Sequence, residues 1–153
     1  MATTAAHPGG SLNSLALSAT LHCLIGCALG EFVGMVIALA LGWGNFAQLA
    51  LAIGLAYLFG FSLTAMPLVR AGLAAGVVVS TALAADTVSI TIMEVVDNLF
   101  VLFIPGAMEA SIGDPLIYIA IAGGFVVAFP PAFWANRYMI ARGTGHAVVH
   151  KYH

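Results

Sequence analysis

The stretch LALSATLHCLIGCALGEFVGMVIALAL, residues 15–41, decides the fold class of this chain. It is apolar almost throughout, and Glu31 is its only residue with a formal charge at neutral pH. An α-helix needs about 20 such residues to cross the hydrocarbon core of a bilayer. We therefore predict a transmembrane helix from Leu15 to Leu41, ended by the break Gly42-Trp43-Gly44-Asn45.

Three further apolar stretches follow, at residues 46–68, 77–104 and 115–138. Pro115 suits the first turn of the last one, whereas Pro130-Pro131 inside it predicts a kink. The prediction is an all-α integral membrane protein, a bundle of four transmembrane helices. Its domain plan is an N-terminal segment at 1–14, a transmembrane domain at 15–138 and a histidine-containing tail at 139–153.

The composition of the whole chain points the same way. Of its 153 residues, 62% are hydrophobic and 7% are charged, whereas soluble domains carry about a quarter charged residues. The lipid bilayer is therefore the expected surroundings of the chain. Its formal net charge of -2 comes with no basic patch, which excludes nucleic acid as a partner. The first ten residues lack the positive region and cleavage site of a secretory signal.

The basic residues give the expected orientation in the membrane. All four lie near or beyond the ends of the second and fourth stretches: Arg70, Arg137, Arg142 and Lys151. The connection between the third and fourth stretches carries Glu109 and Asp114 and no Lys or Arg. Because connections rich in Lys and Arg stay in the cytoplasm, we expect both termini to be cytoplasmic.

The first stretch carries two stripes with a residue at every fourth position: Cys23, Cys27 and Glu31, and about 100° away Gly26, Gly30 and Gly34. Glycines at this spacing let another helix approach closely. The two cysteines have two interpretations, as small buried apolar residues or as metal ligands. Packing does not explain Glu31, because a carboxylate inside a membrane span is costly and usually meets a partner, a cavity or an ion.

The third stretch carries three carboxylates on one helical face: Asp86, Glu94 and Asp97, with Thr87, Thr91 and Asn98 as hydrogen-bonding neighbours. No Lys or Arg lies inside a span to pair with them. Either the carboxyl groups are partly protonated or a bound cation neutralises them.

The depths of these residues connect the first and third helices. At about 1.5 Å per residue, His22 and Asp86 lie at similar depths, as do Cys27 and Glu31 compared with Glu94 and Asp97. If the first and third helices pack together along the glycine stripe, these side chains form a ladder of ligands across the membrane. We expect the first and third helices to pack in this way.

The tail adds three histidines, His146, His150 and His153, in the sequence HAVVHKYH. Their spacing puts them on one face if the tail is helical. Imidazole is the commonest metal ligand among neutral side chains, so they could collect or deliver an ion. The alternative is a solvated tail with no ligand.

Several of these motifs resemble an uncharacterised family of small bacterial membrane proteins, classed as a domain of unknown function. The resemblance rests on HCLIGC with Gly30-Glu31, ADTVSITIMEVVDN, PGAM at residues 105–108 and the terminal HAVVHKYH. It implies the four-helix fold and a multi-pass protein of the bacterial inner membrane. It implies no activity.

The leading functional hypothesis is a transition metal held inside the membrane, for transport, delivery or a cofactor site. The candidate ligands are His22, Cys23, Cys27, Glu31, Asp86, Glu94, Asp97, His146, His150 and His153. Thiolate, imidazole and carboxylate together favour copper or zinc, with iron or manganese also compatible.

The alternative is a structural or accessory subunit of a larger membrane complex, with other subunits or further copies of the chain as partners. A proton relay through Glu31, Glu94 and Asp97 is compatible with both hypotheses. A thiol-redox enzyme using Cys23 and Cys27 stays open, but no nucleotide loop, haem-attachment motif or hydrolase triad supports it.

Overall fold

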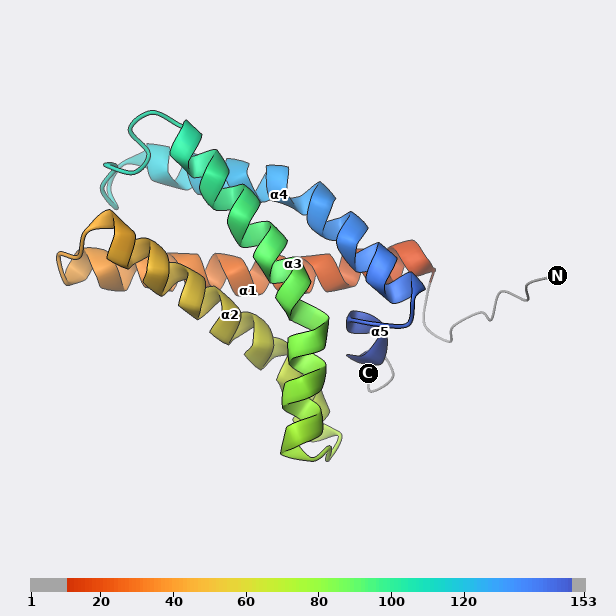
Figure 1. Cartoon of the computed structure of the whole chain (residues 1–153). Coiled ribbons are helices and arrows are strands. Elements are labelled where there is room, and N and C mark those ends of the chain that lie inside the picture. The colour runs from red at the N-terminus through yellow and green to blue at the C-terminus, as the bar shows by residue number, and fades with distance from the viewer. Residues whose placement is uncertain (1–10, 150–153) are drawn as a thin grey trace.

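The computed structural model describes residues 11–149, and four long helices make up most of them. The elements in Figure 1 are α1 (Leu12–Ala40), α2 (Asn45–Arg70), α3 (Ala75–Phe103), α4 (Pro115–Ala141) and the short α5 (His146–Val149). Each of the four long helices is long and apolar enough to cross a membrane. The predicted all-α, four-helix class is confirmed, and the chain has the architecture of a multi-pass membrane protein.

The side chains are distributed as a bilayer requires. Large apolar residues are exposed on all four long helices, including Phe32, Leu58, Val95 and Ile119. The buried positions are mostly small or polar, with alanine the commonest apolar residue among them. Lipid covers such an outer face, and small residues let the helices approach one another inside it.

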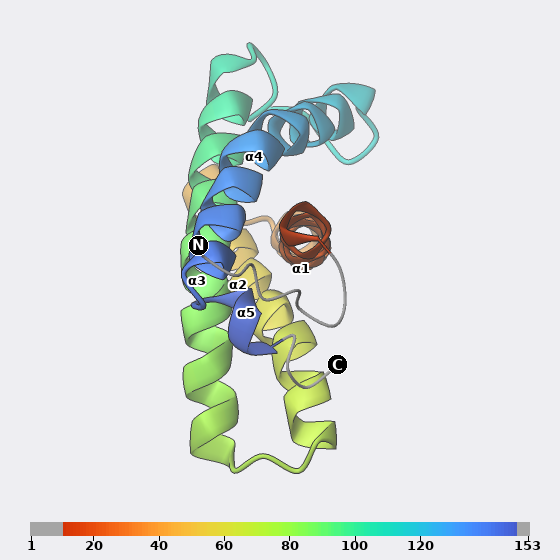
Figure 2. The ribbon, with the colours of Figure 1, turned by 90° about the vertical axis from the view of Figure 1, so that its right-hand side faces the viewer.

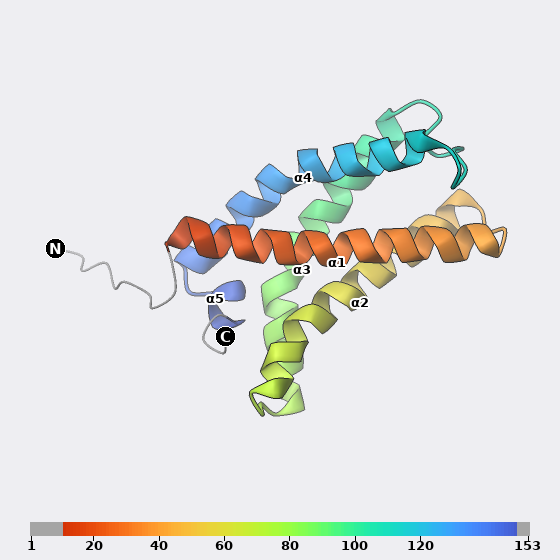
Figure 3. The same ribbon diagram turned by 180° about the vertical axis from the view of Figure 1, so that it is seen from behind.

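The helix ends follow local capping chemistry. Asp114 caps α4 by accepting a hydrogen bond from the Leu116 N–H at 2.9 Å, and Pro115 occupies the first turn as predicted. Gly42 follows α1 with a φ of 67°, a conformation that favours glycine. The predicted kink at Pro130-Pro131 leaves α4 a single helix, whose axis changes direction along its length (Figure 3).

The α1–α2 and α3–α4 connections lie at one end of the molecule. From that end α2 and α3 diverge from α1 and α4, so that the α2–α3 connection projects away from the outer ends of α1 and α4 (Figure 1). The short α5 lies in the angle between the diverging helices (Figure 2). There Val149 packs with Leu68 of α2 and with Val78 and Ala85 of α3.

The glycine stripe of α1 packs against α2, and the expectation that it would contact α3 is wrong. A Cβ atom at Gly30 would lie 2.1 Å from the backbone N of Ala56, and one at Gly26 would lie 2.7 Å from the Cα of Gly60. The short connection between α1 and α2 explains this pairing, because such connections make sequential helices antiparallel neighbours. The stripe of Cys23, Cys27 and Glu31 is then left for α3.

Candidate metal centre

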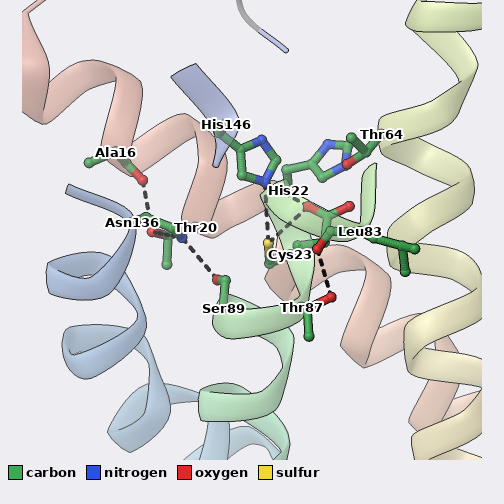
Figure 4. Close-up of polar contacts among 11 residues, drawn as sticks. Ala16, Thr20, His22, Cys23, Thr64, Leu83, Thr87, Ser89, Asn136 and His146 are labelled. Carbon is green, nitrogen blue, oxygen red and sulfur yellow. Dashed lines mark hydrogen bonds and ion pairs between the residues drawn. The ribbon is translucent and has the colours of Figure 1, made fainter. Parts of the chain in front are cut away.

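Three possible metal ligands from three helices meet in the interior. Cys23 comes from α1, Asp86 from α3 and His146 from α5, and one donor atom of each lies within 4.8 Å of the other two. Cys23 Sγ lies 3.6 Å from His146 Nε2 (Figure 4). Asp86 Oδ1 lies 3.8 Å from Cys23 Sγ and 2.7 Å from His146 Nε2. We call these three residues the Cys23 centre.

The Cys23 centre is shielded from the surroundings. Cys23 and Asp86 have no exposed surface, and His146 is 4% exposed. A buried carboxylate, imidazole and thiol in contact are costly unless charges and protons are matched among them. Asp86 Oδ2 has no hydrogen-bond partner in the described part of the chain, so the centre keeps an unused acceptor.

The distances within the Cys23 centre are close to those of a tetrahedral metal site. With bonds of about 2.3 Å to sulfur and about 2.0 Å to nitrogen or oxygen, sulfur stands about 3.5 Å from the other donors, and those two stand about 3.3 Å apart. The two observed distances from sulfur agree with this within a few tenths of an ångström. The nitrogen–oxygen pair is shorter at 2.7 Å, a hydrogen-bond distance, and would open slightly around an ion.

His22 lies beside the Cys23 centre. Its ring centroid is 5.6 Å from that of His146, in an edge-to-face arrangement, and its Nε2 is 2.9 Å from Thr64 Oγ1 of α2 (Figure 4). Thr64 therefore fixes the orientation of the His22 ring. His22 borders the centre and is the nearest candidate for a fourth ligand.

A second polar network lies on the other side of Cys23, and sequence reasoning missed it. The Asn136 amide of α4 donates hydrogen bonds to Thr20 Oγ1 at 3.0 Å and to Ser89 Oγ at 2.9 Å. Ser89 also lies beside the Cys23 thiol. An asparagine within an apolar span was the available signal, whereas Thr20, Thr64 and Ser89 are ordinary residues in such helices.

A separate acidic cluster lies farther along α1, toward the α1–α2 connection. Glu31 of α1 faces Asp97 of α3, and Cys27 contacts Glu94. All four side chains are buried. Asn98 Nδ2 reaches Glu94 Oε2 at 3.4 Å. In the described residues, no N–H or O–H group donates to Glu31 Oε1 or to either Asp97 side-chain oxygen.

The structure thus divides the predicted ligands between two places. The Cys23 centre takes Cys23, Asp86 and His146, with His22 beside it, and the acidic cluster takes Cys27, Glu31, Glu94 and Asp97. His150 and His153 lie outside the described residues. Both cysteines are free thiols.

Thr87 and Thr91, which were predicted as hydrogen-bonding neighbours of the third-helix carboxyl groups, make their hydrogen bonds elsewhere. Thr87 Oγ1 and Thr91 Oγ1 donate to backbone carbonyls of their own helix, and Thr91 also contacts the Tyr57 hydroxyl. Asn98 does reach its neighbour Glu94.

Comparison with known proteins identifies a family. A family model described as "Domain of unknown function (DUF4396)" matches residues 13–145. The chain belongs to this family. The matched range contains all four long helices except Leu12, the first residue of α1, and it includes Cys23 and Asp86 but ends one residue before His146. Neither a curated protein nor a solved structure matches the chain.

Proposed function

We propose that this protein binds a transition metal ion inside the membrane, at the Cys23 centre, and moves that ion across the bilayer. The observation that carries the proposal is the meeting of a thiol, a carboxylate and an imidazole at near-tetrahedral spacing in a buried site. Sulfur, nitrogen and oxygen donors in this combination are typical of zinc sites.

The donor set favours zinc first and copper second. Copper(I) prefers thiolate and thioether ligands, and a carboxylate adds little to it. Magnesium and calcium do not need a thiolate. Asp86 contacts both the Cys23 thiol and the His146 ring. A set of one sulfur, one nitrogen and one oxygen ligand suits a divalent ion of intermediate softness.

Three protein ligands also suit transport better than a permanent structural role. Structural zinc sites are usually closed by four protein ligands, whereas three leave one position open to water or to an exchanging ligand. His22 stands near enough to act as a temporary fourth ligand during exchange. In this proposal both termini face the cytoplasm of a bacterial inner membrane, since all the Lys and Arg residues lie toward that side.

The proposal is tested by elemental analysis of the full chain purified in detergent, beside Cys23→Ser and the matched variant Cys27→Ser. Wild-type protein and Cys27→Ser should each retain zinc or copper in near-stoichiometric amount, and Cys23→Ser should lose it. Cys27 is a fair control because it lies on the same stripe of α1 but outside the Cys23 centre.

Added Co²⁺ provides a second readout, because thiolate-bound Co²⁺ gives an intense ultraviolet charge-transfer band. The band should be present in wild type and Cys27→Ser and absent from Cys23→Ser. Folded wild-type protein that holds no metal and refuses added zinc, copper and Co²⁺ would overturn the proposal. The accessory-subunit hypothesis would then lead.

A further inference from the structure

A small cavity reaches the acidic cluster from the end of the molecule that carries the α1–α2 and α3–α4 connections. Its volume is about 60 Å³, and Glu31 and Asp97 are part of its wall. Asn45, exposed at the start of α2, and Met108, in the α3–α4 connection, also line it. A cavity of this size has room for several water molecules.

The carboxyl groups in this wall have unused ligand capacity. Asp97 is 1% exposed and Glu31 is 6% exposed. No described N–H group and no described hydroxyl group donates a hydrogen bond to either Asp97 side-chain oxygen or to Glu31 Oε1. The two carboxyl groups face each other, an arrangement that needs either a shared proton or a cation between them.

The packing around Asp97 keeps space for its carboxyl group. A Cβ atom at Gly124 of α4 would lie 2.0 Å from Asp97 Oδ1. Any larger residue at position 124 would therefore displace that oxygen. Gln48 and Asn98 add amide groups to the same cavity wall, whose remaining surface is largely apolar.

We propose that Glu31 and Asp97 form a second cation site at the inner end of this cavity, which receives a hydrated divalent metal ion and passes it toward the Cys23 centre. This inference rests on the proposed function for the direction of passage, but the second site itself does not depend on the Cys23 centre. Oxygen donors with retained water bind divalent ions weakly and release them readily, as a receiving site requires.

Side chains that can bind a metal also lie between the two sites along α1. With a rise of 1.5 Å per residue, Cys23 and Glu31 stand about 12 Å apart along the helix axis. Cys27 lies midway on the same stripe and contacts Glu94 of α3. An ion leaving Glu31 and Asp97 therefore meets one thiol and one carboxyl group before it reaches the Cys23 centre.

The test uses the full chain, purified in detergent and stripped of metal, with two probe ions. Mn²⁺ prefers oxygen donors, and its binding is measured from the loss of the free-ion EPR signal. Co²⁺ reports on the Cys23 centre through its thiolate charge-transfer band. Asp97→Asn and Glu31→Gln should each weaken Mn²⁺ binding at least about ten-fold and leave the Co²⁺ band intact.

Two further variants separate the site from general charge effects. Gly124→Ala keeps every donor but crowds Asp97 Oδ1, so it too should weaken Mn²⁺ binding while the Co²⁺ band persists. Glu109→Gln removes an exposed carboxylate of the α3–α4 connection that lies outside the cavity wall. It should change neither measurement.

Passage is measured with the protein in sealed vesicles that contain a zinc indicator. Asp97→Asn should slow zinc entry at least about ten-fold relative to wild type and Glu109→Gln. Wild-type protein that binds no Mn²⁺, or Asp97→Asn and Glu31→Gln variants that bind it as tightly as wild type, would overturn the second site. Equal zinc entry in wild type and Asp97→Asn would overturn its place on the path.

The two proposals fail in different ways. Mn²⁺ binding that persists in wild type without any Co²⁺ band would overturn the Cys23 centre and leave the cavity site standing. A Co²⁺ band without Mn²⁺ binding would overturn the cavity site and leave the Cys23 centre standing. The Co²⁺ band also serves as a check that each acidic-cluster variant has folded, and either Asp97→Asn or Glu31→Gln alone can decide the result.

Discussion

The two stripes of α1 share one spacing and serve opposite purposes. Gly26, Gly30 and Gly34 bring the backbone of α2 into contact and leave no space between the helices. Cys23, Cys27 and Glu31 face the interior with α3 and keep polar atoms there. One helix thus carries its packing contacts on one face and its candidate ligands on another. Substitutions on the two stripes should therefore have different consequences.

The largest expected effect is at the glycine stripe. Gly30→Val would force a side chain against the Ala56 backbone, where even a Cβ atom lies 2.1 Å from the nitrogen. Backbone atoms cannot move aside as a flexible side chain can, so we expect a loss of more than about 3 kcal/mol, beyond ordinary overpacking. Thermal unfolding in detergent measures it.

Gly54→Val is the matched control for Gly30→Val, because nothing lies within 4 Å of a Cβ atom at Gly54. It should unfold at nearly the wild-type temperature. Equal stability of Gly30→Val and Gly54→Val would show that the close α1–α2 contact is not required.

On the stripe of Cys23, Cys27 and Glu31, we expect substitutions to affect metal binding more than the stability of the fold. Cys23→Ala should destabilise metal-free protein by only about 1 kcal/mol, as small core truncations do. It should abolish stabilisation by zinc, which for wild type amounts to about 2.7 kcal/mol at a concentration of 100 times Kd. Unfolding with and without zinc measures both quantities. Zinc stabilising Cys23→Ala as much as wild type would contradict the role of this stripe.

A smaller effect is expected beside the Cys23 centre. His22→Ala removes the ring that lies between Thr64 and His146. Residues that orient ligands usually contribute ten- to a hundred-fold in metal affinity, so we expect zinc affinity to fall about ten-fold, or about 1.4 kcal/mol. Competition with a zinc-binding dye measures it. A loss as complete as that in Cys23→Ala would make His22 a direct ligand.

The smallest expected effect belongs to the network behind Cys23. Asn136→Ala removes two hydrogen bonds and leaves the Thr20 and Ser89 hydroxyls to find other partners. Hydrogen bonds between membrane helices contribute modestly, so we expect a loss of about 1 kcal/mol in unfolding free energy. Unchanged stability, with unchanged zinc affinity, would make the network incidental.

The four helices, and the residues that share each helical face, could be predicted from the sequence because apolar length and residue spacing are local properties. Both stripes of α1 and the shared face of Asp86, Glu94 and Asp97 were predicted in this way. The partner of the glycine stripe was predicted wrongly, because depth in the membrane does not say which helices are neighbours. The short connection after Ala40 was the better guide.

The division of the candidate ligands into two groups could not be predicted from spacing along single helices. It depends on α5, which turns back toward the interior and brings His146 to the level of Cys23 rather than that of Cys27. The cavity beside Glu31 and Asp97 depends likewise on side chains from four helices and a connection. Such assemblies are set by tertiary packing.

The position of His146 also bears on how the protein is made. One donor of the Cys23 centre lies in the first helix and another follows the last long helix. A ribosome therefore releases Cys23 into the membrane while His146 is still unsynthesised. The nascent chain cannot assemble the centre until all four spans are inserted and α5 has folded back, so the centre forms late in biogenesis.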